Sequence, residues 1–586
     1  MKKLLLYILT VFFIVNVHAQ YYFRGEIRNT KGAPLQNVKV LVHSSHLLYY
    51  TGEEGGFGIS SPTATDSITV CIEGYETLAI KLDANVFAKI VLKDISVNPS
   101  SNRIRLISVT KDMGQASTFT PAQNDESYFS IVENEIVDAK KYPNTGFSLN
   151  VDKASYSNIR RFLNLKSEVP PDAVRIEELL NYFGLHYTEP EHDKIFKVES
   201  QVTDCPWNAK NKLLYLNINA HKLNLDKVPP CNLVFLLDAS GSMDMPGKLP
   251  LIKAAFQMLV KNLRPIDTVS IVTYGGNVGV VLKPTSGAEK QKIIQAIEEI
   301  NADGDTPGEA GIRTAYDVAE KSFNKKGSNR IILATDGDFN VGETSEAGLN
   351  DLIAKERLTN VYLTCLGVGT GNFKDSKLET LAKKGNGNYA YLDNIGEAEK
   401  VLVKEMTQTF FVVANNVSLN VQFNPDVIKE YRLIGFDNKK DAVADSTGQL
   451  EGGEIGSGNS VMAIFEVTPT GVINSTPKGP MPQQNIASVT IKYNLCNDTL
   501  NNQIQYDCPN NYTAFKSIDK SYQFAAALTM FGMKLRESKY IGNAQWSDIE
   551  AIATSSFDPN NYLQKEFLQL IAIAKKIYSK KKKYVE

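Results

Sequence analysis

The chain has 586 residues, of which 43% are hydrophobic, and its formal net charge is −2. This length is too great for a single hydrophobic core, so several domains are expected. A nearly neutral chain lacks the strongly basic surface that binds nucleic acid, and we therefore expect no nucleic-acid partner. The six cysteines are too few for a disulfide scaffold, and no Cys-x-x-Cys pair suggests a zinc site.

The first 19 residues have the order of a secretory signal peptide. Two lysines follow Met1, residues 4–17 are apolar, and the small residue Ala19 precedes Gln20. This order predicts cleavage after Ala19. The apolar stretch is short for a hydrocarbon layer of about 30 Å. We therefore expect an exported protein (periplasmic, cell-surface or secreted) with no integral membrane segment after cleavage.

The segments that follow differ in pattern. Residues 20–93 contain short alternating apolar runs separated by turns with Gly and Pro, which is typical of a small β-sandwich. Residues 94–125 are polar and predict a linker. Residues 126–195 carry two helical patterns. In the second pattern, Glu177 and Glu178 are expected to be solvated charges, because neighbours in a helix point apart.

Residues 231–411 alternate apolar strands with amphipathic helices, the pattern of a doubly wound, mainly parallel sheet. Strand-like segments also occur before it, in 196–230, and after it, in 412–510. We infer that these segments pair into one β-sandwich, into which the α/β domain is inserted. Residues 511–586 have helical periodicity. The predicted fold class is therefore multidomain α/β and β, with an additional N-terminal β-sandwich and C-terminal helices.

Two pairs of cysteines flank short segments of the chain. Cys205 and Cys231 lie on either side of a predicted strand, and Cys496 and Cys508 lie on either side of a polar turn between two predicted strands. Export permits disulfide formation. The sequence leaves open whether either pair forms a bridge.

Oxygen-bearing side chains follow two apolar strands and begin one helix of the α/β region. Asp238 ends the first strand, and Ser240 and Ser242 follow it at alternate positions; Thr306 precedes a predicted helix, and Asp336 ends another strand. Ligands of open α/β sheets bind outside the carboxyl ends of the strands, and Mg²⁺ prefers oxygen ligands. Asp-x-Ser-x-Ser alone is also typical of an ordinary turn, so the later segments carry the argument. We expect all five side chains in surface loops.

With these residues the chain resembles the von Willebrand factor type A domain. The resemblance implies that Asp238, Ser240, Ser242, Thr306 and Asp336 form a metal-ion-dependent adhesion site. It implies a Mg²⁺ (or Mn²⁺) held by the three hydroxyls, with the two carboxylates nearby or bridging through water. A metal with few charged ligands stays electron-poor, so its open position favours an anionic oxygen. The expected partner is a protein that presents an acidic residue.

The resemblance extends beyond this domain. Residues 147–162, 174–183 and 431–435 resemble the flanking regions of one exported bacterial subfamily. Gly25, Pro34 and residues 56–57 resemble a carboxypeptidase regulatory-like domain. The implied order is a signal peptide (1–19), a carboxypeptidase regulatory-like β-sandwich (20–93), a linker (94–125), a helical flanking region (126–195), the type A domain (231–411) within a β-sandwich (196–230 and 412–510), and a C-terminal helical region (511–586).

The predicted function is non-enzymatic: an exported protein that uses its metal site to capture an acidic group of a partner. One alternative is an envelope scaffold or assembly factor whose site no longer functions. A metal-dependent hydrolase is a further alternative. It is disfavoured because the sequence has no His-Glu-x-x-His motif and no histidine close to the site residues in sequence.

Overall fold

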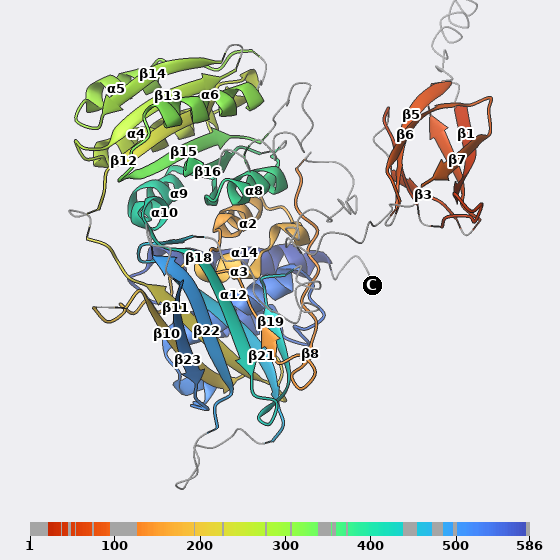
Figure 1. Ribbon diagram of the computed structural model, residues 1–586. Helices are drawn as coiled ribbons and strands as arrows, with labels where there is room; N and C mark the ends of the chain where they lie inside the picture. Colours follow the sequence, from red (N-terminus) through yellow and green to blue (C-terminus); the bar gives the residue numbers. More distant parts are fainter. Residues whose placement is uncertain are drawn as a thin grey trace, which may run out of the picture. The chain divides into compact units, whose positions relative to one another are not determined.

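The computed structural model describes residues 21–93 and 126–581, except for residues 37, 45–47, 53, 62, 73–74, 193, 225–227, 276–277, 305–307, 338–352, 354–358, 371–372, 438–453, 472–483 and 496–500. The chain forms two compact units, Met1–Leu106 and Ile107–Glu586 (Figure 1). The predicted signal peptide (1–19) and linker (94–125) lie outside the described residues.

The first unit is a small β-sandwich. Three strands form one sheet, in the order β4 (Gly56–Ser61), β1 (Tyr21–Asn29) and β7 (Ala88–Leu92). Four strands form the other, in the order β3 (Leu48–Tyr50), β2 (Lys39–Val42), β5 (Thr65–Cys71) and β6 (Leu78–Asp83). Alternate residues of each strand point inward, so Phe23 and Ile27 of β1 meet Val40 of β2 and Ile68 of β5 in one core.

The second unit contains a six-stranded sheet in the order β14-β13-β12-β15-β16-β17, parallel except for the edge strand β14. Successive side chains of the central strand β12 (Cys231–Asp238) point to opposite faces of the sheet, so Phe235 packs against one layer of helices and Leu236 against the other. The strands are β12 (Cys231–Asp238), β13 (Thr268–Tyr274), β14 (Gly279–Ser286), β15 (Ser328–Thr335), β16 (Tyr362–Val368) and β17 (Tyr389–Leu392). The helices are α4 (Leu249–Asn262), α5 (Lys290–Glu298), α6 (Gly308–Lys321), α8 (Asp375–Lys384), α9 (Ile395–Glu399), the π-helical turn η5 (Lys400–Lys404) and α10 (Met406–Phe410).

Strands from both sides of this α/β domain pair with each other. Strand β11, upstream of the domain, pairs with β21, downstream of it, from Lys212 opposite Val467 to Asn219 opposite Ser460. The first sheet has the order β10 (Phe196–Asp204), β11 (Lys212–Ala220), β21 (Ser460–Pro469), β19 (Ile428–Ile434) and β8 (Val137–Asp138). The second has β20 (Ile455–Gly456), β18 (Val412–Phe423), β22 (Ala487–Leu495) and β23 (Asn501–Cys508), with β9 (Asn144–Thr145) on β18. The doubly wound domain is therefore inserted in a β-sandwich, as predicted.

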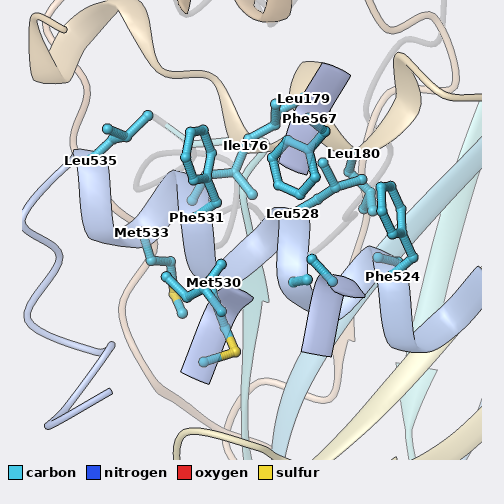
Figure 2. Packing of buried hydrophobic residues seen from close by; sticks show 14 of the residues in the cluster. Ile176, Leu179, Leu180, Phe524, Leu528, Met530, Phe531, Met533, Leu535 and Phe567 are labelled. Carbon is cyan, nitrogen blue, oxygen red and sulfur yellow. The ribbon is translucent and has the colours of Figure 1, made fainter. Parts of the chain in front are cut away.

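Helices cover the outer face of the first sheet. Tyr215 of β11 points toward them, whereas its neighbour Leu214 points into the sandwich. Figure 2 shows Ile176 packed among aromatic and aliphatic side chains that include Phe531 and Phe567. The helices are α2 (Ala154–Asn164), α3 (Ile176–Asn181), α12 (Lys520–Leu535), α13 (Trp546–Ser556) and α14 (Tyr562–Lys581), with short 3-10 turns η2 (Pro171–Ala173) and η6 (Phe515–Ser517). Among the described residues, no helix has both the length and the apolar character needed to cross a membrane.

The structure answers the question of a disulfide for the pair Cys205 and Cys231. Cys205 and Cys231 are both free and buried, and they lie in different hydrophobic clusters, so no disulfide joins them. Cys508 is also free, and it lies opposite Ala487, at the end of the β22–β23 hairpin away from the turn. That register places Cys508 at the opposite end of β22 from Leu495. Cys496 itself lies outside the described residues.

One sequence-based expectation about charge is wrong. Glu178 is 3% exposed, and its carboxylate pairs with Arg175. Arg175 also reaches Asp375 of the α/β domain, with Nη1 2.7 Å from Oδ2. Burial raises the pKa of the Glu178 carboxyl, and the positive charge of Arg175 opposes this rise. Glu178 is therefore part of a buried ionic contact between the upstream helices and the α/β domain, because α3 is enclosed by tertiary packing.

Candidate metal centre

Four of the five predicted ligand residues meet at the carboxyl edge of the six-stranded sheet. Strands β12 and β15 are parallel neighbours, so Asp238 at the end of β12 lies close to Asp336, which directly follows β15. The turn after β12 contains the 3-10 segment η3 (Gly241–Met243) and directs Ser242 to Asp336, with Oγ 2.9 Å from Oδ2. The hydroxyl of Ser240 lies 3.3 Å from that of Ser242 and 2.7 Å from Oδ1 of Asp238.

Thr306, the fifth predicted ligand, lies outside the described residues. The start of its loop is described and lies against the Asp238 turn. The amide of Asp303 donates to the carbonyl of Ala239 at 2.7 Å, and the amide of Gly241 donates to the carbonyl of Gly304 at 3.1 Å. Helix α6 begins two residues after Thr306, at Gly308. The loop is therefore anchored beside the site at its first residues.

Asp238 is held by neutral groups. Its Oδ1 accepts hydrogen bonds from the amide and the hydroxyl of Ser240, and its Oδ2 accepts them from Thr335 at 2.7 Å and Tyr274 at 3.3 Å. Burial raises the pKa of the Asp238 carboxyl, and the hydrogen bonds from Ser240 and Thr335 oppose this rise. These donors orient the carboxylate toward the turn without neutralising its charge.

Asp336 has a cationic neighbour that the sequence did not indicate. The ammonium of Lys248 lies 2.8 Å from Oδ2 of Asp336, the same oxygen that accepts a hydrogen bond from Ser242. Lys248 directly precedes α4 and is 3% exposed. Lysine is usually an exposed residue, so its type gave no signal. Only its place before the helix that follows the Asp238 turn could have suggested a role.

The expectation that all five side chains lie in surface loops is only partly correct. Ser242 is exposed, whereas Asp238 and Asp336 are 0% exposed and Ser240 is 2% exposed. The carboxylates form the floor of the site, and the residue Ser242 lies at its surface. Substitution of either aspartate therefore affects the interior of the domain as well as any ligand.

The donor set suits a hard divalent cation. It consists of carboxylate and hydroxyl oxygens, which Mg²⁺ and Mn²⁺ prefer over nitrogen or sulfur ligands. In the described part of the chain, no group of three or more His, Cys, Asp or Glu residues is placed to bind a metal. Two buried carboxylates beside one ammonium leave the buried side chains of the site with one negative charge. Lys248 thus marks a position where a positive charge is favoured.

The upstream region also reaches this edge of the sheet. The amide of Lys374 lies 3.4 Å from the carbonyl of Asp336, and Ser127 forms an isolated parallel bridge with Lys374. The amide of Ser127 donates to the carbonyl of Phe373 at 3.1 Å. Residues just after the predicted linker are therefore hydrogen-bonded to the segment that supports Asp336.

Three family models match consecutive parts of the chain. Residues 232–409 match the family model of the von Willebrand factor type A domain. Residues 122–215 match a model described as von Willebrand factor, and residues 408–577 match the C-terminal region of the uncharacterized protein YfbK. Inter-alpha-trypsin inhibitor heavy chain H2 of Mus musculus is 29% identical over 214 residues, which are 34% of this chain and 21% of that protein. The solved structure of a von Willebrand factor type A protein from Catenulispora acidiphila covers 66% of this chain and 90% of its own, at 14% identity and a TM-score of 0.39.

A longer match comes from a bacterial protein. The uncharacterized protein YfbK of Escherichia coli (strain K12) is 36% identical over 467 residues, which are 76% of this chain and 80% of that protein. Family models also match the α/β domain and the regions on both sides of it, and together they run from residue 122 to residue 577. The chain therefore belongs to the YfbK family of proteins that contain a von Willebrand factor type A domain.

Proposed function

We propose that this protein is exported and non-enzymatic, and that it captures an acidic group of a protein partner through a Mg²⁺ (or Mn²⁺) ion. The residues that hold the ion are Asp238, Ser240, Ser242, Thr306 and Asp336. One observation carries the proposal: Ser240, Ser242, Asp238 and Asp336, from two strand ends, converge on one edge of the sheet. When bound, the ion supplies an electrophilic centre for a carboxylate oxygen.

The arrangement of the protein groups supports binding rather than proton transfer. Both oxygens of Asp238 accept hydrogen bonds, from Ser240 and from Thr335. A carboxylate held in this way orients a ligand set, and its geometry does not direct it toward a substrate proton. Ser242 is an exposed residue whose hydroxyl is directed to Asp336, so this side of the site is the one that a partner can approach. The signal peptide and the carboxypeptidase regulatory-like character of residues 20–93 belong to the same proposal, with the small β-sandwich as a spacer or docking unit.

Metal binding is tested first, on the mature full-length chain. We expect one Mn²⁺ per molecule by calorimetry and electron paramagnetic resonance, and loss of binding in Asp238→Ala. Because Asp238 is buried, Asp238→Asn is the safer variant: it keeps the size of the side chain and removes its charge. Asp317→Asn, at an exposed position of α6, is the matched control. Equal Mn²⁺ uptake by wild type and Asp238→Asn would contradict the site assignment.

Partner capture is tested next, by pull-down from cell-envelope extract in Mg²⁺ and in EDTA. A protein retained only in Mg²⁺, and not by Asp238→Asn, supports the proposal. With that partner, we expect Thr306→Ala to keep part of its metal affinity, because four of the five predicted ligand residues remain. We expect its affinity for the partner to fall more than its affinity for the metal. Unchanged partner affinity in Thr306→Ala would argue against carboxylate capture at this site. Metal binding without any metal-dependent partner would favour the alternative of an envelope scaffold.

A further inference from the structure

Lys248 combines three features that are unusual for a lysine. It is deeply buried, it contacts a predicted metal ligand, and its side chain packs against a glycine, Gly369. We propose that Lys248 is a built-in cation of the metal site, which stabilises Asp336 when the metal is absent and makes the metal-loaded site selective for an anionic partner group. This inference rests on the proposed function, because it concerns the same site.

The contact itself is direct. The Nζ of Lys248 lies 2.8 Å from Oδ2 of Asp336, and the two side chains are 4% and 0% exposed. The hydroxyl of Ser242 lies 2.9 Å from the same oxygen. A carboxylate at this depth is strongly destabilised unless a cation or several donors accompany it. Lys248 therefore places a positive charge beside the same oxygen that accepts a hydrogen bond from Ser242, a predicted metal ligand.

The burial of Lys248 is built into the fold. Its backbone is fixed at the start of α4, since its amide donates to the carbonyl of Met245 and its carbonyl accepts from the amide of Ile252. Gly369, just after β16, has a φ of +84°, and a Cβ at this position would lie 2.4 Å from Cε of Lys248. The hydroxyl of Tyr391 holds the carbonyl of Gly369 at 2.6 Å. The lysine stem therefore lies where only a residue without a side chain leaves room for it.

The net charge of the buried side chains changes sign when a divalent ion binds. Asp238 and Asp336 carry two negative charges and Lys248 carries one positive charge, so their sum is −1 without a metal and +1 with a divalent ion. The described hydrogen bonds to Asp238 come from neutral groups, which leave this sum unchanged. Lys248 thus weakens metal binding by repulsion and leaves the loaded site cationic. A cationic site attracts a carboxylate and disfavours a neutral ligand.

The test uses two variants that remove the charge. Lys248→Met keeps an unbranched side chain of similar length, and Lys248→Gln keeps a hydrogen-bond donor for Asp336. We expect Mn²⁺ to bind both variants about tenfold more tightly than wild type, because a nearby repelling charge is lost. We also expect a lower melting temperature than wild type in EDTA, and a larger rise of the melting temperature on addition of Mn²⁺. Lys253→Met is the control: this lysine lies on α4, its ammonium donates to the carbonyls of Glu298 and Ile300, and metal affinity is expected to be unchanged.

Selectivity for an anion is tested with acetate as the carboxylate probe. In the presence of Mn²⁺-loaded wild type, we expect paramagnetic broadening of the acetate methyl signal, and severalfold weaker broadening with Lys248→Gln. Equal or weaker Mn²⁺ affinity in both Lys248 variants, or equal acetate broadening, would overturn the role of Lys248 and leave the proposed function standing. Absence of Mn²⁺ binding in wild type and in all variants would overturn the proposed function itself.

Discussion

The guanidinium of Arg160 joins three regions of the chain, and its removal is expected to destabilise the second unit. Arg160 lies on α2 and is 3% exposed. Its Nε lies 2.7 Å from Oδ2 of Asp393, its Nη2 2.7 Å from Oε2 of Glu397, and its Nη1 3.0 Å from Oε1 of Glu566. Asp393 and Glu397 belong to the α/β domain, and Glu566 belongs to α14. One side chain thus connects the upstream helices, the α/β domain and the C-terminal helices.

The magnitude follows from what Arg160→Met leaves behind. Removing one partner of a buried ion pair costs about 3–5 kcal/mol, because the other charge stays buried without compensation. The carboxylates of Asp393 and Glu397 are 9% and 2% exposed, so water does not replace the guanidinium. Burial already raises the pKa of Glu397, opposed chiefly by Lys400 and by Arg160. We therefore expect a loss of about 3–5 kcal/mol of unfolding free energy near neutral pH.

The assay can use the native fluorophores. The two tryptophans of the chain, Trp207 and Trp546, both pack against the helical cluster that contains α3, α12 and α14. Unfolding in urea followed by tryptophan fluorescence therefore reports on this cluster. Because a chain of several domains need not unfold in one step, the midpoint of the first transition is the quantity to compare. We expect this midpoint to fall clearly in Arg160→Met.

Two further variants make the result interpretable. Arg313→Met removes an exposed arginine that pairs with Glu309 on α6, and its expected effect is about 0–1 kcal/mol. The double variant Arg160→Met/Glu397→Gln also removes one of the uncompensated charges and is expected to recover part of the loss. A shift in Arg160→Met no larger than that in Arg313→Met would refute the reasoning, as would a double variant less stable than Arg160→Met.

Three other predictions concern the pH dependence of stability, the close backbone contact at Gly275 and the domain boundary. Burial raises the pKa of Glu454 from 4.5 to about 7, so its contribution to stability is present below pH 4.5 and is lost as pH rises through 7. Relative to Glu454→Gln, wild type should lose about 3 kcal/mol over this window, measured by urea unfolding at several pH values. Gly275 has a φ of +138°, and a Cβ there would lie 2.3 Å from the backbone of Ala239; Gly275→Ala should therefore weaken Mn²⁺ binding in calorimetry and lower the melting temperature. The polar composition of residues 94–125 predicts that limited proteolysis cuts there first and releases the small β-sandwich, and first cleavage within α4 would contradict this boundary.

Periodicity predicted the fold class, and the resemblance to the von Willebrand factor type A domain assigned the site residues. Apolar strands that alternate with amphipathic helices form a doubly wound sheet because each strand must be covered on both faces. Once β12 and β15 are parallel neighbours, the residues at their carboxyl ends lie together. This pairing is the physical reason why Asp238 and Asp336, which the resemblance assigns to one site together with Ser240 and Ser242, meet in the structure. Thr306 stays a prediction, because it lies outside the described residues.

Tertiary packing decided the environment of each charge. Lys248 and Glu178 are residue types that are usually solvated, and nothing local to them indicates burial. Lys248 is enclosed because Gly369, more than one hundred residues later, leaves room for its stem. Glu178 is enclosed because Arg175 joins α3 to Asp375 of the α/β domain. Likewise, the register between β22 and β23 places Cys508 opposite Ala487, at the far end of β22 from Leu495. Such contacts depend on the distances between elements that are far apart in the chain, which local periodicity does not encode.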